Sequence, residues 1–248
     1  MNTFRADLHV HTVLSPCAEV EMIPPFIVSE AIGLGINLIA ITDHNASANV
    51  QAVQKAAKGT SLVVIPGMEL QTREEVHVLC LFDHLEQLES LQKLVDAALP
   101  HLENNAEFFG EQFVVDETGE FIRRETRLLI TSTSFTLREA WEKVSALGGL
   151  LIPAHIDRKA FGLMANLGLV PTDIPIEALE LSRHTRPELA CQIYPQLSGI
   201  PLIQNGDVHR LDEYLGVTSF ELDHPSISEI RLALHAQAGR RFKVDPNR

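Results

Sequence analysis

Short apolar runs, each about as long as a buried strand, alternate along this chain with longer stretches that carry helix signals. The strand-like runs cover residues 7–12, 37–42, 61–65, 76–82, 149–154, 176–182 and 200–204. The helix-like stretches cover residues 24–33, 46–58, 85–99, 137–147, 187–196 and 226–238. Strands that alternate with helices favour a parallel sheet, and about seven strands in 248 residues fit a closed barrel more economically than an open sheet. The alternation therefore predicts an α/β fold of the β/α barrel type.

One segment, from about residue 100 to 135, departs from this alternation. Residues 113–122 predict a β-hairpin that turns at residues 116–119. Basic residues follow the hairpin, namely Arg123, Arg124 and Arg127. We expect an insertion within a single domain of residues 1–248, because no repeat, low-complexity tract or linker separates a second one. A lid over the strand ends, a dimer contact and a loop without a catalytic role are all compatible with this segment.

Residues that commonly bind metals stand at or near the carboxyl ends of nearly all the strand-like runs. In the first run, Asp7, His9 and His11 are predicted to share one face, because side chains alternate along a strand. The later candidates are His44, Glu69, His77, His155, Asp207 and His209. The opening motif alone fits an edge strand with a solvated polar face equally well. Its recurrence favours a metal site, since imidazole is a common ligand and barrel active sites lie at the strand ends.

Four ordered blocks of this sequence resemble the polymerase and histidinol phosphatase (PHP) domain family. The blocks are Asp7-Leu-His9-Val-His11-Thr12, Ile41-Thr-Asp43-His44-Asn45, Gly67-Met-Glu69 with His77, and Pro153-Ala-His155 with Asp207-Val-His209. Each block is weak by itself, but the ordered set is specific and extends over nearly the whole chain. The resemblance implies a distorted seven-stranded β/α barrel whose strand ends hold two or three divalent metals, usually zinc, manganese or iron.

The resemblance also implies a ligand set. One metal would be bound by His9, His11, Glu69 and Asp207. Glu69 would bridge to a second metal, which His77 and His155 would complete. A third metal would take His44 and His209.

The third metal position departs from the family pattern. Cys17 stands where many members have a histidine, and Pro16 where others have an aspartate. A Cys17 thiolate would be a competent zinc ligand, and Glu19 or Glu21 could take its place. Alternatively, Cys17 is a small buried residue and this position is empty or completed by water.

The ligand set predicts a hydrolase acting on phosphoester bonds. A water that bridges two divalent ions loses a proton near neutral pH, and the resulting hydroxide can attack a bound phosphorus. The expected substrate is a phosphomonoester or phosphodiester in a nucleotide, short oligonucleotide or small phosphorylated metabolite. Asp7 and Asp43 are candidates for orienting histidines or moving protons, and His184 is a candidate acid for the leaving group.

Cationic residues near the later strand ends are candidates for binding the substrate phosphate, because guanidinium groups bind phosphate through two hydrogen bonds. They are Arg158, Arg183 and His184, with Arg186 close by in the sequence. Ion pairs with surface carboxylates are an equally consistent role for the arginines.

Three other functions compete with this prediction. A histidinol-phosphate phosphatase is slightly disfavoured because position 17 is not a histidine. An amidohydrolase acting on a carbon–nitrogen bond would be expected to have a bridging lysine where this chain has Glu69. A non-catalytic PHP module, as occurs in some polymerases, is disfavoured by the intact ligand set.

Composition predicts a cytoplasmic protein. No apolar run approaches the roughly 18 residues of a membrane span, and the first strand begins too early to leave room for a signal peptide. Three scattered cysteines, Cys17, Cys80 and Cys191, give no disulfide framework. The net charge of −13 disfavours a stable complex with long nucleic acid, but it is compatible with a small phosphorylated substrate or a short oligonucleotide.

Overall fold

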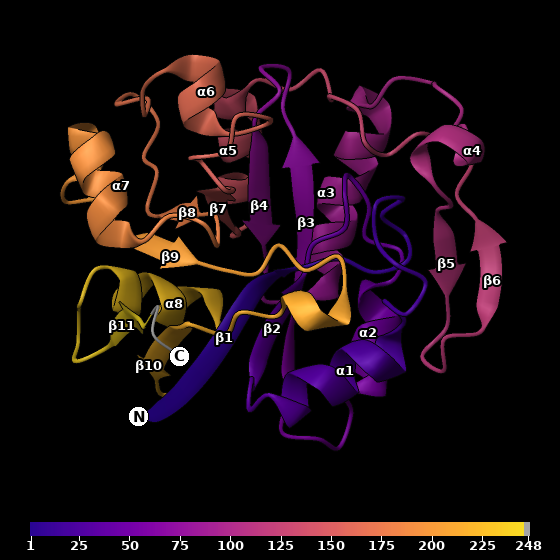
Figure 1. Ribbon diagram of the computed structural model, residues 1–248, viewed down its shortest axis with the longest axis horizontal. Coiled ribbons are helices and arrows are strands. Elements are labelled where there is room, and N and C mark those ends of the chain that lie inside the picture. Colours follow the sequence, from indigo (N-terminus) through magenta and orange to yellow (C-terminus); the bar gives the residue numbers. More distant parts are fainter. Residues whose placement is uncertain (246–248) are drawn as a thin grey trace.

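The computed structural model describes residues 1–245 (Figure 1). Its strands are β1 (Asn2–Val10), β2 (Leu38–Ile41), β3 (Val63–Gln71), β4 (His77–Leu81), β5 (Phe113–Val115), β6 (Phe121–Arg124), β7 (Leu150–Pro153), β8 (Leu179–Leu181), β9 (Leu202–Gln204), β10 (Thr218–Leu222) and β11 (Arg241–Val244). Its helices are α1 (Pro24–Gly33), α2 (Val50–Ala56), α3 (Leu85–Ala98), α4 (Ala106–Phe109), α5 (Leu137–Ala146), α6 (Leu163–Leu167), α7 (Pro187–Ile193) and α8 (Ile227–Leu234).

Local sequence chemistry accounts for several of these helices. Pro24 begins α1, where the missing N–H of proline costs nothing. A capping box of Thr136 and Glu139 begins α5. In α3 the buried residues Leu88, Leu91 and Val95 are spaced by three and four positions, so the helix has one apolar face. None of the helices in residues 1–245 is long and apolar enough to cross a membrane.

The main sheet has seven strands in the order β11-β10-β1-β2-β3-β4-β7 and curls into a half-barrel. The predicted fold class, a distorted seven-stranded α/β barrel, is thereby confirmed. Strands β1, β2 and β3 are parallel. Helices α1, α2, α3 and α5 contribute buried side chains to one core cluster, and α8 contributes to a second cluster with interior residues of the sheet.

The prediction of a parallel sheet is wrong for part of it, because β4 is antiparallel to both β3 and β7. Strand β3 ends at Gln71 and β4 begins at His77, and this connection is too short for the crossover that a parallel pair needs. Strand β3 also continues through Pro66 and Gly67, where the sequence predicts a strand end. At Gly67 a Cβ would lie 2.9 Å from Thr42 Cγ2, so glycine permits the close approach of β2.

Two of the seven predicted strands lie outside the main sheet. The runs 176–182 and 200–204 contain β8 and β9, which form a separate parallel pair. Strands β10 and β11, which were not predicted, take their places in the seven-stranded sheet beside β1. Polar and charged residues interrupt both strands, so neither has the continuous apolar character used to find the others.

The β8–β9 pair lies beside the main sheet, near β7 and the end of β1 (Figure 1). Ile156, after β7, donates its N–H to the carbonyl of Glu180 in β8 over 2.9 Å. Val208, after β9, exchanges hydrogen bonds of 2.9 Å with the backbone of His9 and His11. These contacts bring the chain after β9 to the same edge as the ends of β1, β2 and β3.

The predicted hairpin within the insertion is confirmed. Strands β5 and β6 pair antiparallel, and the turn is closed by a hydrogen bond of 3.0 Å from Gly119 N to the carbonyl of Asp116. The Asp116 side chain accepts a further bond of 2.8 Å from Thr118 N. The extent of the single domain, residues 1–248, stays a prediction.

Candidate metal centre

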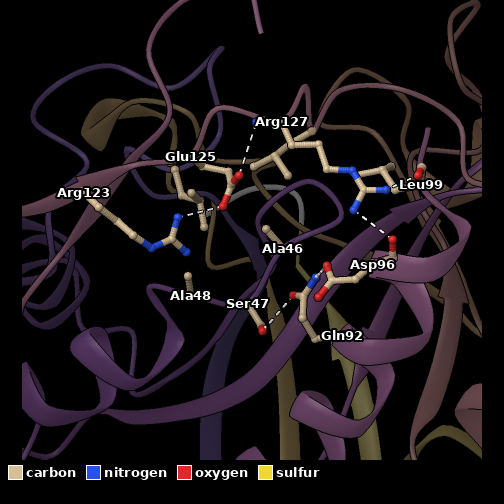
Figure 2. A pocket seen from close by; sticks show the side chains of 11 residues that line it. Ala46, Ser47, Ala48, Gln92, Asp96, Leu99, Arg123, Glu125 and Arg127 are labelled. Carbon is tan, nitrogen blue, oxygen red and sulfur yellow. Dashed lines mark hydrogen bonds and ion pairs between the residues drawn. The ribbon is translucent and has the colours of Figure 1, made fainter. Parts of the chain in front are cut away.

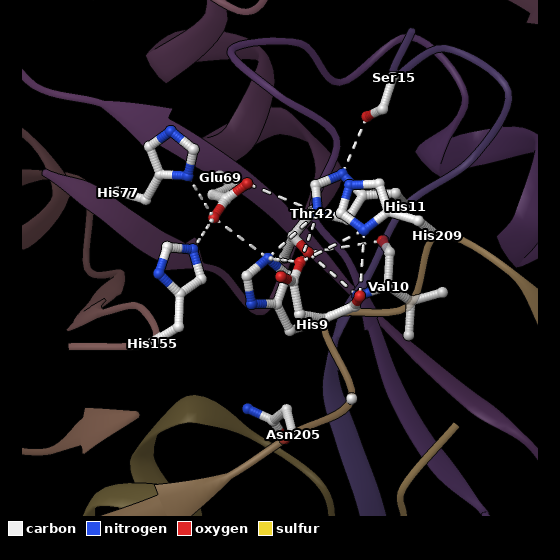
Figure 3. A network of polar contacts seen from close by, with 12 residues as sticks. His9, Val10, His11, Ser15, Thr42, Glu69, His77, His155, Asn205 and His209 are labelled. Atoms are coloured by element: carbon white, nitrogen blue, oxygen red, sulfur yellow. Dashed lines mark hydrogen bonds and ion pairs between the residues drawn. The ribbon is translucent and has the colours of Figure 1, made fainter. Parts of the chain in front are cut away.

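Histidine and carboxylate side chains converge at one edge of the curled sheet (Figure 3). His9 and His11 come from the end of β1, His44 follows β2, Glu69 lies in β3, His77 begins β4, His155 follows β7, and Asp207 and His209 lie between β9 and β10. All are buried except His209, which is partly buried. Because β4 is antiparallel, its amino end rather than its carboxyl end reaches this edge, which explains why His77 stands at the start of an apolar run.

Three overlapping groups have ligand atoms that lie within 4.8 Å of one another. The first group contains His9, His11, Glu69 and Asp207; the second contains His44, Glu69 and His77; the third contains His11, His44 and His209. These groups, which share members, match the geometry of a multinuclear metal centre.

Glu69 belongs to both of the first two groups, and each of its oxygens contacts histidines of both. Its Oε1 lies 3.2 Å from His9 Nε2, 2.9 Å from His77 Nδ1 and 3.1 Å from His155 Nε2. Its Oε2 lies 2.8 Å from His44 Nδ1 and 3.5 Å from His11 Nε2. Figure 3 shows His77 and His155 pointing toward Glu69 from one side, with His11 and His209 on the other.

The donor set fits divalent cations. The Nε2 atoms of His9 and His11 lie 3.1 Å apart, so both nitrogens can face one cation when the protons are on the Nδ1 atoms, which contact Glu180 and Ser15. Glu69 Oε2 and His155 Nδ1 are buried and have no hydrogen bond of acceptable geometry within the described residues. Mixed imidazole and carboxylate ligands suit zinc, manganese and iron.

The electrostatics of the cluster favour anionic carboxylates. Burial alone would raise the pKa of Glu69, but His77, His9 and His44 outweigh it and hold that pKa well below its usual range. The pKa of Asp207 is also held well below its usual range, because His9 and His11 outweigh its burial. Burial and the neighbouring His209 and His44 lower the pKa of His11, so its imidazole is neutral and able to bind a metal.

Glu180 supports the ligands from behind, and sequence reasoning missed it. This buried carboxylate in β8 contacts His9 Nδ1 at 3.0 Å and accepts bonds of 2.8 Å from His155 N and from Asn205 Nδ2. It therefore fixes the ring of His9, with Nε2 facing the cluster. The available signal was an acidic residue between Leu179 and Leu181 in an apolar run, where an unpaired charge would be costly.

Asp43 acts on the cluster through Ser15. It accepts bonds of 2.7 Å from Thr12 N and from Ser15 Oγ, and Ser15 Oγ lies 2.9 Å from His11 Nδ1. Since Ser15 donates to Asp43, its oxygen is free to accept from His11, which leaves His11 Nε2 as the ligand atom. Burial raises the pKa of Asp43. These contacts connect Asp43 to His11 through Ser15.

Asp7 does not join the cluster, so the prediction that it shares a face with His9 and His11 is wrong. The pairing of β1 with β2 shifts register between Asp7 and Val10, which breaks the strict alternation of side chains. The Asp7 carboxylate instead accepts bonds of 3.0 and 2.9 Å from the backbone N–H groups of Gly206 and Leu215. It thereby anchors the loop that carries Asp207.

Cys17 lies beside the third group. Its Sγ is 3.3 Å from His44 Nε2, and the residue is exposed. Burial of the sulfur opposes ionisation, but His44 and a hydrogen bond from His209 outweigh it and lower the pKa of the thiol to about 6. Glu19 and Glu21, the alternative ligands, are exposed and belong to none of the three groups.

The three candidates for phosphate binding differ in position. Arg158 Nη1 lies 2.5 Å from Asp207 Oδ2, at the edge of the cluster. Arg183 instead donates to the backbone carbonyl of Glu213, and His184 is exposed. Only Arg158 of the three contacts a member of the cluster in the hydrogen bonds and ion pairs of residues 1–245.

Backbone strain is concentrated at the cluster. His155 has φ +28°, Asp207 has φ +50° and Asn45, next to His44, has φ +49°. Such left-handed conformations are costly outside glycine and persist where surrounding contacts enforce them, often at functional sites. For Asn45 the enforcing contacts are bonds from its Nδ2 to the carbonyls of Leu129 at 2.7 Å and Thr131 at 2.9 Å.

The insertion packs beside the cluster rather than supplying ligands to it. A cavity of about 370 Å³ separates it from α3 and residues 46–48 (Figure 2). The arginines at this cavity are engaged, because Arg123 pairs with Glu125 at 2.8 Å and Arg127 donates to carbonyls at the end of α3. The insertion also holds the segment after β2, because Asn49 bonds to the backbone of Phe113 and Val115 at 3.0 Å. The lid and dimer roles stay predictions.

The curled α/β sheet carries a buried histidine and carboxylate cluster with the arrangement of a multinuclear metal centre. The sequence model of the family described as PHP domain matches residues 7–150, which is more than half of the chain. The chain therefore belongs to the PHP domain family of metal-dependent phosphoesterases.

Solved structures with low sequence identity share this fold. The lesion-specific endonuclease EndoQ from Pyrococcus furiosus has a TM-score of 0.76 at 22% identity over 99% of this chain. Endonuclease Q in complex with a 27-mer duplex substrate with an abasic lesion has a TM-score of 0.69 at 22% identity over 95% of this chain. This chain spans only 60% and 57% of those two proteins.

A proposed metal-dependent phosphoesterase from Bifidobacterium adolescentis has a TM-score of 0.57 at 18% identity. That match covers 83% of this chain and 87% of the other. A search of the curated proteins finds no significant match.

Proposed function

We propose that this protein hydrolyses a phosphoester of a nucleotide or short oligonucleotide at a centre of two or three divalent ions. The observation that carries the proposal is Glu69, which belongs to two of the groups of ligand atoms and contacts histidines of both through each of its oxygens. Bound ions would activate water as a nucleophile near neutral pH and neutralise charge on the phosphoryl oxygens.

The ligand roles follow from the contacts. His9, His11 and Asp207 would hold the first ion with Glu69. His77 and His155 would hold the second ion with Glu69. His44 contacts the other oxygen of Glu69, Oε2, and so lies near the same ion. His44 and His209, with the Cys17 thiolate, would hold a third.

Protein groups outside the ligand set would bind and orient the substrate. Arg158 is the candidate for a charge-assisted hydrogen bond to the phosphate, since its guanidinium lies beside Asp207 and is partly exposed. His184 stays a candidate acid for the leaving group. Asp43 would keep His11 in the tautomer that binds metal.

Two observations bear on the substrate class, and they favour different substrates. Endonuclease Q, whose fold this chain shares, has been solved with a DNA duplex. This chain, however, carries a net charge of −13 and spans 57% of that protein. Affinity for a long duplex comes mainly from basic side chains that neutralise its phosphates. An acidic chain is therefore better matched to a nucleotide or short oligonucleotide than to a long duplex.

The test combines elemental analysis with a substrate panel. After reconstitution with zinc, manganese or iron, we expect at least two ions per chain and hydrolysis of at least one phosphomonoester, phosphodiester or short RNA. Glu69→Gln should lower both metal content and turnover by about tenfold or more, as other changes in the surroundings of metal ligands do. Glu86→Gln, on the first turn of α3, is the matched control. Fewer than one ion per wild-type chain would contradict the proposal.

A further inference from the structure

A phenylalanine ring stands at the mouth of the metal centre. The ring of Phe161 stacks on that of His77 with centroids 4.4 Å apart and planes inclined by 6°. His77 in turn lies 2.9 Å from Glu69. Phe161 is 40% exposed, so its ring contacts His77 and is also open to solvent. Its direct neighbour His77 belongs to the cluster.

The position of this ring is imposed by its turn. Phe161 has φ +59°, a conformation that bulky side chains rarely adopt. Its carbonyl accepts a bond of 3.0 Å from His77 N. The next residue is held just as tightly, because a Cβ on Gly162 would lie 2.2 Å from the carbonyl oxygen of Arg158. The left-handed backbone disfavours an aromatic residue at position 161, and the exposed ring gains little from burial. Packing in the core therefore does not explain why a phenylalanine stands there.

The same turn carries positive charge. Arg158 reaches Asp207 across 2.5 Å, and Lys159 is exposed. A rigid aromatic face beside two cations and a metal centre matches the chemistry of a nucleotide, which joins a flat base to a phosphate. A sugar phosphate or other small metabolite would use the cations but leave the ring uncovered.

We propose that Phe161 is a specificity-determining residue that stacks on the base of the substrate while the phosphate lies at the metal centre. This inference rests on the proposed phosphoesterase function and narrows it to nucleosidic phosphoesters. It also gives the turn at residues 157–162 a role in recognising the substrate. The ring acts from beyond the ligand shell, through contact with the base.

The test uses substrates matched except for the base. The probes are 2-aminopurine riboside 5′-phosphate and ribose 5-phosphate, each also as its methyl ester. Base stacking on a side chain typically changes affinity about tenfold or more, so Phe161→Leu should lower kcat/KM for the base-containing esters by that factor. The same variant should weaken fluorescence quenching of 2-aminopurine. Phe161→Trp should restore both, and hydrolysis of the ribose esters should not change.

Other outcomes separate stacking from structural support of His77. If Phe161→Leu loses metal on elemental analysis and slows all esters equally, the ring only supports His77 and the proposal is overturned. Equal kcat/KM of the wild type for both probes would overturn it as well. If no ester is hydrolysed but quenching still depends on Phe161, the phosphoesterase function fails while the base-binding role stands.

Discussion

Replacing Glu180 with glutamine should weaken the metal centre although Glu180 is not itself a ligand. Both of its oxygens are in use: Oε1 accepts from Asn205 Nδ2 at 2.8 Å and Oε2 from His155 N at 2.8 Å, and both contact His9. In Glu180→Gln, whichever oxygen becomes an amide NH₂ group will face a donor. One buried N–H then loses its partner, at a cost of about 1–3 kcal/mol.

The second consequence concerns His9. A neutral amide holds the imidazole less firmly than a carboxylate does, and such changes behind a ligand typically lower metal affinity or activity by about 10- to 100-fold. We therefore expect Glu180→Gln to unfold at lower urea concentration in EDTA and to bind zinc more weakly in equilibrium dialysis.

Glu188→Gln is the matched control, because Glu188 is exposed in the first turn of α7. It should change neither quantity by a measurable amount. If Glu180→Gln keeps the zinc affinity and the unfolding midpoint of this control, Glu180 does not hold His9 and the reasoning is refuted.

Three further predictions concern separate features. With cobalt bound, the wild type should show a sulfur-to-metal charge-transfer band that Cys17→Ser lacks, and an identical spectrum would place Cys17 outside the ligand shell. Arg158→Ala should lower kcat/KM for phosphoesters by about 10- to 100-fold at unchanged metal content, and a normal rate would remove its role in phosphate binding. Hydrogen bonds from Arg240 hold the pKa of Glu229 below its ordinary value of 4.5, so their stabilisation is present above that pH and is lost on acidification. Glu229→Gln should therefore be less stable than the wild type to urea at pH 7, and a difference that persists undiminished at pH 2 would contradict this linkage.

The sequence by itself determined the fold class and most of the cluster. Strand-like runs followed by histidines and acids identified His9, His11, His44 and Glu69, since apolar continuity and ligand chemistry are local properties of the chain. The hairpin at residues 113–122 was equally readable, because its turn is closed by the Asp116 side chain and by Gly119.

Other features depended on which segments pair in three dimensions. The register shift in β1 turns Asp7 away from the histidines, and no local pattern marks it. The antiparallel direction of β4 brings the amino end of that strand to the cluster. Strands β10 and β11 are too polar to be recognised alone and are stabilised by pairing beside β1.

Tertiary structure also decided the roles of charged residues. Arg158 and Arg183 carry similar local signals, yet only the folded chain sets Arg158 against Asp207 and Arg183 against a backbone carbonyl. The fold likewise sets Glu180 behind His9. The physical reason is that hydrophobic periodicity depends on neighbours along the chain. The partner of a buried charge, by contrast, is supplied by whichever distant segment the fold brings within hydrogen-bonding distance.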